Sequence, residues 1–131
     1  MHRHTLLGYL VTVALAANIP LACATPTATE SNLIGDPGRG KNLYQGCQAC
    51  HSIEDNDLGP RHRGVVGRHA GSVEDYNYSQ ALKNSGLTWD AATLDRWLTN
   101  SSALVPGTKM YFQLDDPQAR ADIIAYLGQL K

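Results

Sequence analysis

The chain has 131 residues, of which 43% are hydrophobic, and a formal net charge of −1 at pH 7. This length leaves room for one domain. The near-neutral charge argues against a nucleic-acid partner, because such partners need a strong positive field.

The first 24 residues have the pattern of a secretory signal peptide, which predicts a periplasmic protein. A basic start with Arg3 precedes an apolar run over 6–17 that is short for a membrane span, and small residues then allow cleavage after Ala24. A retained membrane anchor and lipidation at Cys23 are the alternatives. Cleavage leaves 10 Lys+Arg (11 minus Arg3) against 12 Asp+Glu, hence a net charge of −2, and leaves two cysteines.

Residues 25–35 are rich in Thr, Pro and Ser and lack an apolar period, which predicts a flexible tether before a domain over 36–131. The first helix of this domain is expected to begin at Asp36-Pro37. Asp supplies an N-cap acceptor and Pro suits the first helical position. The helix then runs toward Cys47.

Three further helices are expected along the domain. A short one over 79–85 ends at Gly86, which suits a left-handed C-cap, the next follows Asp90, and the last opens at Asp116-Pro117. The segments between them are rich in Gly and Pro, and no alternating strand is visible. The sequence thus predicts an all-α fold of three or four short helices and long loops, whose modest core would accommodate a large apolar cofactor. The apolar residues of the last two helices fall on one face of each: Leu94, Trp97 and Leu98; then Ala119, Ile123, Tyr126, Leu127 and Leu130.

The segment Cys47-Gln48-Ala49-Cys50-His51 is a C-x-x-C-H motif, which is typical of c-type haem attachment. Each thiol forms a thioether with one haem vinyl group, and His51 then lies under the iron as an axial ligand. A redox dithiol or half of a zinc site are the alternatives. The first would need a βαβ pattern and the second another pair of cysteines, and neither is found. We therefore predict one covalently attached haem c.

Met110 is the candidate for the second axial ligand. The chain has two methionines, one of them the initiator, and Met110 follows Pro106-Gly107 in a loop that would hold its sulfur in place. The alternatives are that Met110 simply fills a gap in the core, or that His62 or His69 binds the iron instead.

In this arrangement of motifs the chain resembles the class I cytochromes c, specifically their bacterial, mitochondrial-like branch. The resemblance covers about 35–131 and implies the cytochrome c fold wrapped around one haem. The matching segments are Gly35-Asp36-Pro37, Gly40-Lys41, Cys47–Ser52, Gly59-Pro60, Gly64–Arg68, Ala70-Gly71, Tyr78-Ser79, Gly86–Trp89, Pro106–Met110 and Arg120–Leu127.

The resemblance also implies roles for individual residues. The carbonyl of Pro60 would accept a hydrogen bond from the ring N–H of His51. A haem propionate would be hydrogen-bonded by Tyr78 and Trp89, with Arg68 nearby to offset its charge. The resemblance further places Trp97 near the Met110 sulfur and Phe112 beside the haem edge. It also implies that Gly40 and Tyr44 pack against Ile123 and Tyr126, where the terminal helices cross.

The chain departs from the family in three respects. His62 stands where an apolar residue is usual, Ser101 replaces a common proline, and few lysines remain for the face around the haem edge. The candidates for a smaller positive rim are Lys41, Lys83 and Lys109. The identity of a partner therefore does not carry over from basic mitochondrial relatives.

The predicted function is one-electron transfer by a monomeric carrier, with no catalytic residues and both axial positions filled by protein. Its expected partners are redox proteins such as a membrane cytochrome complex, an oxidase, a dehydrogenase or a photosynthetic centre. A haem enzyme or gas binder with an open iron position, in which His62 would serve as a distal base, is one alternative. A subunit of a larger dehydrogenase or oxidase complex is the other.

Overall fold

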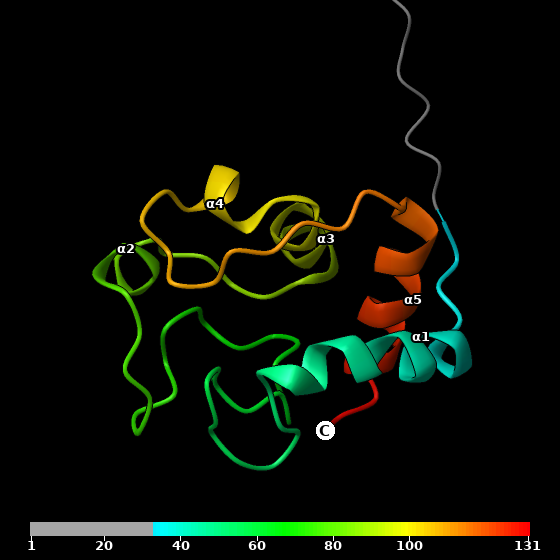
Figure 1. Ribbon diagram of the computed structural model, residues 1–131, viewed down its shortest axis with the longest axis horizontal. Coiled ribbons are helices and arrows are strands. Elements are labelled where there is room, and N and C mark those ends of the chain that lie inside the picture. Colours follow the sequence, from blue (N-terminus) through cyan, green and yellow to red (C-terminus); the bar gives the residue numbers. More distant parts are fainter. Residues whose placement is uncertain (1–32) are drawn as a thin grey trace, which may run out of the picture. The chain divides into compact units, whose positions relative to one another are not determined.

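The computed structural model describes residues 33–131, so the predicted signal peptide and most of the predicted tether lie outside the described residues. The described part consists of helices and loops, and its one strand-like pairing is an isolated bridge between His69 and Thr88. The predicted all-α fold is confirmed, and no helix in this part is long and apolar enough to cross a membrane. Figure 1 shows the elements in chain order: α1 (Pro37–Leu43), the 3-10 helix η1 (Tyr44–Ala49), α2 (Gln80–Lys83), α3 (Ala91–Thr99), α4 (Ser101–Leu104) and α5 (Pro117–Leu127).

Helices α1, α3 and α5 begin at the predicted capping residues. The side chain of Asp36 accepts two backbone N–H groups of the first turn of α1, at 2.7 and 3.0 Å, and a proline follows it. Asp116 and Asp90 accept N–H groups of α5 and α3 in the same way, at 2.9 and 2.7 Å. Gly86 has the predicted positive φ of +66°, but α2 ends earlier than predicted, at Lys83, and Asn84 is its C-cap. Short-range capping chemistry thus sets these boundaries.

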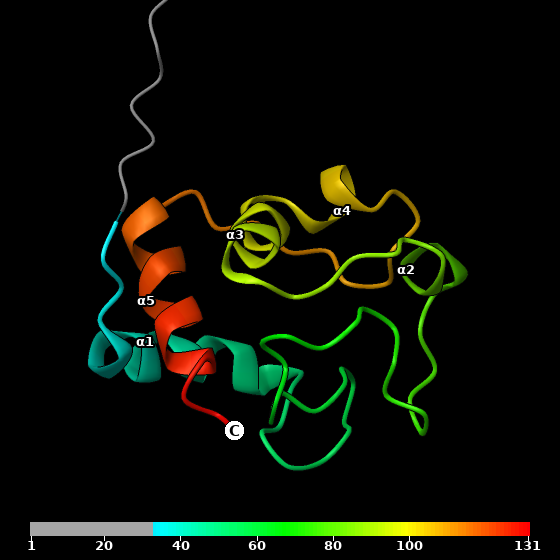
Figure 2. The same ribbon diagram turned by 180° about the vertical axis from the view of Figure 1, so that it is seen from behind.

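Helices α1 and α5 cross and pack against each other, as Figures 1 and 2 show from opposite sides. Gly40 makes this close approach possible, because a Cβ there would lie 1.9 Å from the carbonyl oxygen of Asp122 and 2.9 Å from the Cβ of Tyr126. The ring of Tyr44, which begins η1, packs 5.2 Å from the ring of Tyr126. The crossing therefore fixes where the segment after α1 starts.

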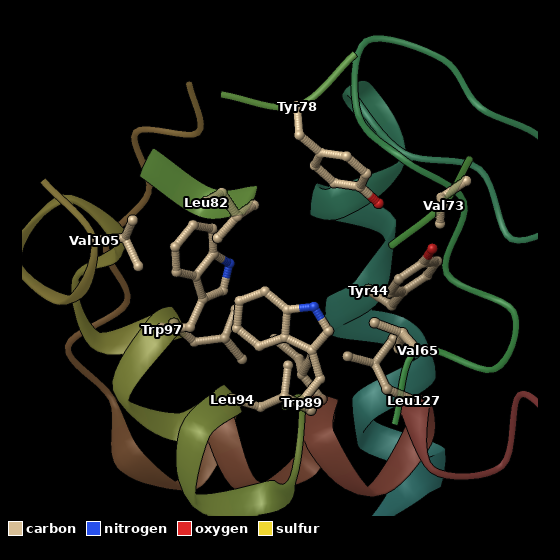
Figure 3. Packing of buried hydrophobic residues seen from close by; sticks show 12 residues of the cluster. Tyr44, Val65, Val73, Tyr78, Leu82, Trp89, Leu94, Trp97, Val105 and Leu127 are labelled. Atoms are coloured by element: carbon tan, nitrogen blue, oxygen red, sulfur yellow. The ribbon is translucent and has the colours of Figure 1, made fainter. Parts of the chain in front are cut away.

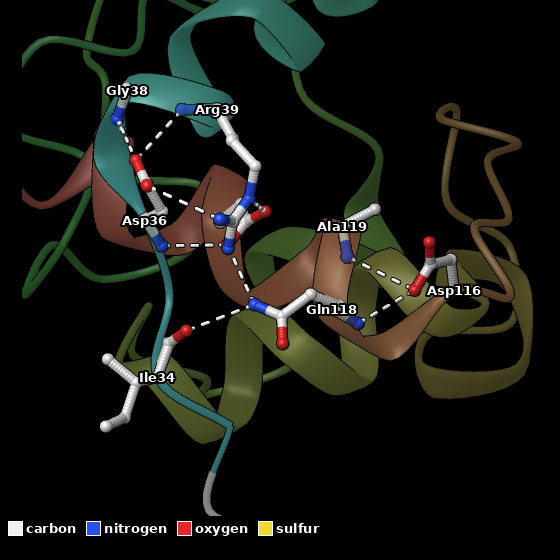
Figure 4. A network of polar contacts seen from close by, with 8 residues as sticks. Ile34, Asp36, Gly38, Arg39, Asp116, Gln118 and Ala119 are labelled. Carbon is white, nitrogen blue, oxygen red and sulfur yellow. Dashed lines mark hydrogen bonds and ion pairs between the residues drawn. The ribbon is translucent and has the colours of Figure 1, made fainter.

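A network of polar contacts also joins α1 and α5 where they cross, as Figure 4 shows. Asp122 of α5 is 2% exposed and accepts two hydrogen bonds from the guanidinium of Arg39 in α1, at 2.8 and 3.0 Å. It also accepts the backbone N–H of Asp36 at 2.7 Å and the side-chain amide of Gln118 at 2.9 Å. These contacts, led by that with Arg39, hold the pKa of Asp122 well below its ordinary value. The sequence analysis did not predict this network.

Helix α4 is an addition to the predicted helices, and its first residue fastens a loop. Ser101 is fully buried, and its hydroxyl donates to the carbonyl of Met110 at 2.7 Å and accepts the N–H of Phe112 at 3.0 Å. Asn100 caps α4 by accepting the N–H of Ala103 at 2.9 Å. The departure at Ser101 thus places two hydrogen bonds on the backbone of the loop that carries Met110.

Candidate functional site

The centre of the molecule holds a cavity of about 330 Å³, within the size range of cofactor sites. Its wall includes residues of η1, α2, α3 and α5 and of the loops between them, and Figure 3 shows Tyr78, Trp89 and Trp97 close together although they come from separate segments. All ten predicted site residues lie in this wall: Cys47, Cys50, His51, Pro60, Arg68, Tyr78, Trp89, Trp97, Met110 and Phe112.

The two cysteines lie on one tight turn at the edge of this cavity. Cys47 belongs to η1 and Cys50 ends it. The carbonyl of Cys47 accepts the N–H of Cys50 at 3.1 Å and that of His51 at 2.9 Å. Both thiols are free, that of Cys47 half-buried and that of Cys50 exposed, and burial raises the pKa of Cys47. The turn therefore offers two thiols and an imidazole to one group in the cavity.

The imidazole of His51 is held in one orientation and one tautomer. Its Nδ1–H donates to the carbonyl oxygen of Pro60 at 2.8 Å, which leaves Nε2 with a free lone pair. The backbone of Gly59 lies against the ring, and a Cβ there would be 2.2 Å from Cε1. The side chain is nearly buried, and burial lowers its pKa, which favours the neutral form that binds metals.

Of the other two candidate histidines, His62 also lines the cavity and His69 does not. The ring of His62 stacks on that of His51, with centroids 4.0 Å apart and planes at 21°. His62 therefore lies beside His51, which argues against a ligand facing His51 across the cavity. Burial, together with the charges of His51 and Arg68, lowers the pKa of His62 to about 3. His69 is exposed, bonds to Thr88 through Nδ1 at 3.0 Å, and lies outside the cavity wall.

The loop of Met110 is fixed at several points. Its carbonyl is bonded to Ser101, and its N–H reaches the hydroxyl of Thr108 at 3.4 Å. Lys109 donates to the carbonyl of Asn77 at 2.8 Å, which ties the loop to the segment before α2. The Met110 side chain is half-buried, packs against the core and lines the cavity. A thioether is thus available on the same cavity as His51.

Two tryptophans and one arginine are among the other polar groups of the wall. Trp89 and Trp97 are buried, with their rings 5.1 Å apart and tilted at 57°. Arg68 donates to the carbonyls of Arg61 and Arg63 at 2.8 and 3.2 Å, and burial lowers its pKa. The bonds of Arg68 are to neutral groups, so the cavity contains a cation that an anionic group would neutralise.

The exposed surroundings of the cavity are mixed in character. Leu58 and Tyr111 lie in its wall and are 74% and 81% exposed, so the mouth has an apolar border. Lys41, Lys83 and Lys109 are all exposed, but the ammonium of Lys109 is bonded to the Asn77 carbonyl.

Sequence reasoning missed one contact inside the site. The hydroxyl of Tyr44 and Nδ1 of His62 share a hydrogen bond of 3.0 Å behind the imidazole of His51. The polar residue at position 62 was the available signal, but its partner lies 18 residues away and becomes visible when the chain folds.

Comparison with known proteins identifies the family. The profile of the family described as "Cytochrome c" matches residues 38–131. The chain is 52% identical over 98 residues to "Cytochrome c2" of Rhodomicrobium vannielii, covering 72% of this chain and 78% of that protein. It is 38% identical over 121 residues to "Cytochrome c-554" of Methylosinus trichosporium, covering 89% of each. Among solved structures, cytochrome cH from Methylobacterium extorquens aligns with a TM-score of 0.70 and 48% identity, covering 72% of this chain and 98% of that one.

The chain belongs to the cytochrome c family. Cytochromes c are electron-transfer proteins rather than enzymes, and they carry one covalently attached haem c. The cavity fits that group. Cys47 and Cys50 are free at its edge, and His51, against whose ring the backbone of Gly59 lies, lines the same cavity. The predicted class, fold and cofactor are confirmed.

Proposed function

We propose that this cytochrome c is an exported mono-haem carrier of single electrons whose iron is bound by His51 and Met110. The observation that carries the proposal is that two free thiols, an oriented imidazole and a thioether all lie in the wall of one largely apolar cavity. These are the groups that c-type haem requires, in number and in kind.

Cys47, Cys50 and His51 would hold one side of the haem. The thiols would form the thioethers, and the hydrogen bond of His51 to the Pro60 carbonyl would leave Nε2 free for the iron and raise its basicity. When bound, the haem supplies one-electron redox chemistry at its iron. The protein would contribute two ligands that its own hydrogen bonds hold in place.

Met110 would be the second ligand, which leaves no iron position for a substrate. Its loop is fastened by Ser101, Thr108 and Lys109, so the sulfur is held in place. A His/Met pair raises the reduction potential relative to two nitrogen ligands. Walls such as those formed by Trp97 and Phe112 raise it further, because an apolar site disfavours the extra charge of the oxidised iron.

Tyr78, Trp89 and Arg68 would bind a haem propionate. Two observations support this role. All three residues lie in the cavity wall, and the hydrogen bonds of Arg68 are made to neutral carbonyl groups. A carboxylate there would gain both hydrogen-bond donors and a compensating charge.

Export to the periplasm follows from the chemistry of attachment and from the pattern of residues 1–24, since c-type haem is attached outside the cytoplasm. The partners would be redox proteins: a membrane cytochrome complex, an oxidase, a dehydrogenase or a photosynthetic centre. Relatives named cytochrome c2 from Rhodomicrobium vannielii and Blastochloris viridis support a carrier of this kind.

The assignment of Met110 is tested by Met110→Ala in the haem-loaded protein. Loss of the sulfur should abolish the far-red absorption band of Fe–Met ligation, lower the reduction potential and allow rapid CO binding. His69→Ala is the control, because His69 lies outside the cavity wall. A Met110→Ala spectrum identical to that of the wild type, or loss of the band in His69→Ala, would refute the assignment.

A further inference from the structure

We propose that Tyr44 and His62 form a positioning pair that holds the plane of the His51 imidazole and thereby tunes the reduction potential. The inference rests on the proposed role of His51 as an iron ligand. It concerns residues that the electron-carrier function does not otherwise use.

The contact between the two histidines is a face-to-face one. The rings of His62 and His51 lie 4.0 Å apart at an angle of 21°, close enough to limit the rotation of either about its Cβ–Cγ bond. The Nδ1 atom of His62 is bonded to the hydroxyl of Tyr44 at 3.0 Å, and the two rings are tilted at 56°. Tyr44 thus fixes His62 by a directional bond, and His62 fixes His51 by its ring face.

Tyr44 is itself immobilised, which makes it a suitable anchor. It is 1% exposed and packs against Tyr126 at 5.2 Å, inside the crossing of α1 and α5. It also begins η1, the turn that carries Cys47. The pair therefore links the most extensive helix contact of the described fold to the imidazole at the cavity.

The orientation of His51 is controlled from three directions. The Pro60 carbonyl holds Nδ1 at 2.8 Å, the Gly59 backbone lies so near the ring edge that a Cβ would be 2.2 Å from Cε1, and His62 covers a face. The first two contacts set the tautomer and the depth of the ring. The third resists a twist of its plane, which the hydrogen bond to Pro60 alone permits over a broad range of angles. Outer contacts of this kind tune the ligand and through it the metal.

The test uses haem-loaded His62→Leu and Tyr44→Phe, with Tyr126→Phe as the matched control. The control removes a hydroxyl from the other ring of the same aromatic pair while leaving the Tyr44–His62 bond in place. Two quantities are measured: the midpoint potential, and the spread of hyperfine-shifted haem methyl resonances in the oxidised protein, which depends on the plane of the axial imidazole.

We expect His62→Leu and Tyr44→Phe to shift both quantities in the same direction. The ratio of reduced to oxidised protein at a fixed ambient potential should change about threefold, a fraction of the effect of one neutral hydrogen bond. Tyr126→Phe should leave both unchanged. The double variant Tyr44→Phe/His62→Leu should shift no further than His62→Leu alone, because Tyr44 acts through His62.

His62→Asn covers the case in which the leucine variant does not fold, since Asn retains a hydrogen-bonding group near Nδ1 but lacks the ring face, and it too should shift both quantities. Unchanged resonances and potential in the position-62 variants would overturn the inference. So would additive effects in the double variant, or an equal shift in Tyr126→Phe. Failure of the proposed ligation would be seen separately, as a wild-type spectrum without the His/Met signature.

Discussion

At the scale of single residues, the contact of Gly59 with His51 makes the sharpest steric demand in the site. A Cβ at position 59 would lie 2.2, 2.4 and 2.7 Å from three ring atoms of His51, whose Nδ1 is tied to the next carbonyl. Gly59→Ala should therefore push the imidazole from its place and weaken that bond. We expect a loss of about 1–3 kcal/mol in the free energy of unfolding and a weakened His–Fe bond.

Thermal unfolding and the visible spectrum of the haem-loaded protein measure these two effects. Gly128→Ala is the control, because Gly128 has an ordinary helical φ of −63° and a Cβ there meets its nearest atoms at 3.5 Å. Equal stability of the two variants would show that the backbone at position 59 yields easily and that the close approach has no function.

The helical elements are held together by groups far apart in sequence, and Asp122 is the centre of the main polar contact. Its interactions depress the folded-state pKa of the carboxylate, chiefly through Arg39. The stabilisation is fully present above the ordinary carboxyl pKa of about 4 and is lost as the pH falls below it toward the folded value. Asp122→Asn should thus be destabilised most at neutral pH, and its stability should approach that of the wild type under strongly acidic conditions.

Urea unfolding at pH 7, 5 and 3 gives this comparison. Asp116→Asn, at the N-cap of the same helix, is the matched control, because asparagine caps a helix as well as aspartate does and Asp116 contacts backbone N–H groups. A constant stability difference between Asp122→Asn and the wild type at all three pH values would contradict the assigned role of the carboxylate.

Comparison of these elements shows which parts of the structure the sequence could predict. The side chains of Asp36 and Asp116 accept hydrogen bonds from backbone N–H groups two or three residues further along the chain. The local sequence pattern is therefore sufficient to locate the start of these helices. The bond of Arg39 to Asp122 joins residues 83 positions apart, and that of Ser101 to Phe112 requires α4 and the following loop to meet. No local signal in one sequence encodes such pairs.

The site shows the same division. The C-x-x-C-H motif and the single internal methionine could be read directly, because haem attachment restricts both spacing and residue type. His62 was noticed as an unusual residue and as an alternative ligand or distal base, but its contact with His51 was not predicted. Its contact with His51 depends on a chain reversal between them, which brings the N–H of His62 to the carbonyl of Ser52 at 3.0 Å.

At the scale of the whole molecule, the cavity lies where a small protein would normally place its core. Trp89, Trp97, Leu94 and Leu98 all line it, although each is at most 7% exposed. Short helices and long loops bury a modest area around it, so the group that fills it should supply much of the packing. The folded state is therefore expected to depend on covalent haem.

Cys47→Ala/Cys50→Ala, which cannot retain haem covalently, tests this dependence. Purified without haem, the double variant should lose most of its helical circular dichroism and its cooperative thermal transition, because the walls of the cavity would have nothing to pack against. Cys50→Ala keeps the thiol of Cys47, so it should retain a haem through one thioether and unfold cooperatively at a lower temperature than the wild type. Native-like helix content and a sharp transition in the haem-free double variant would instead mean that the protein part closes the cavity unaided.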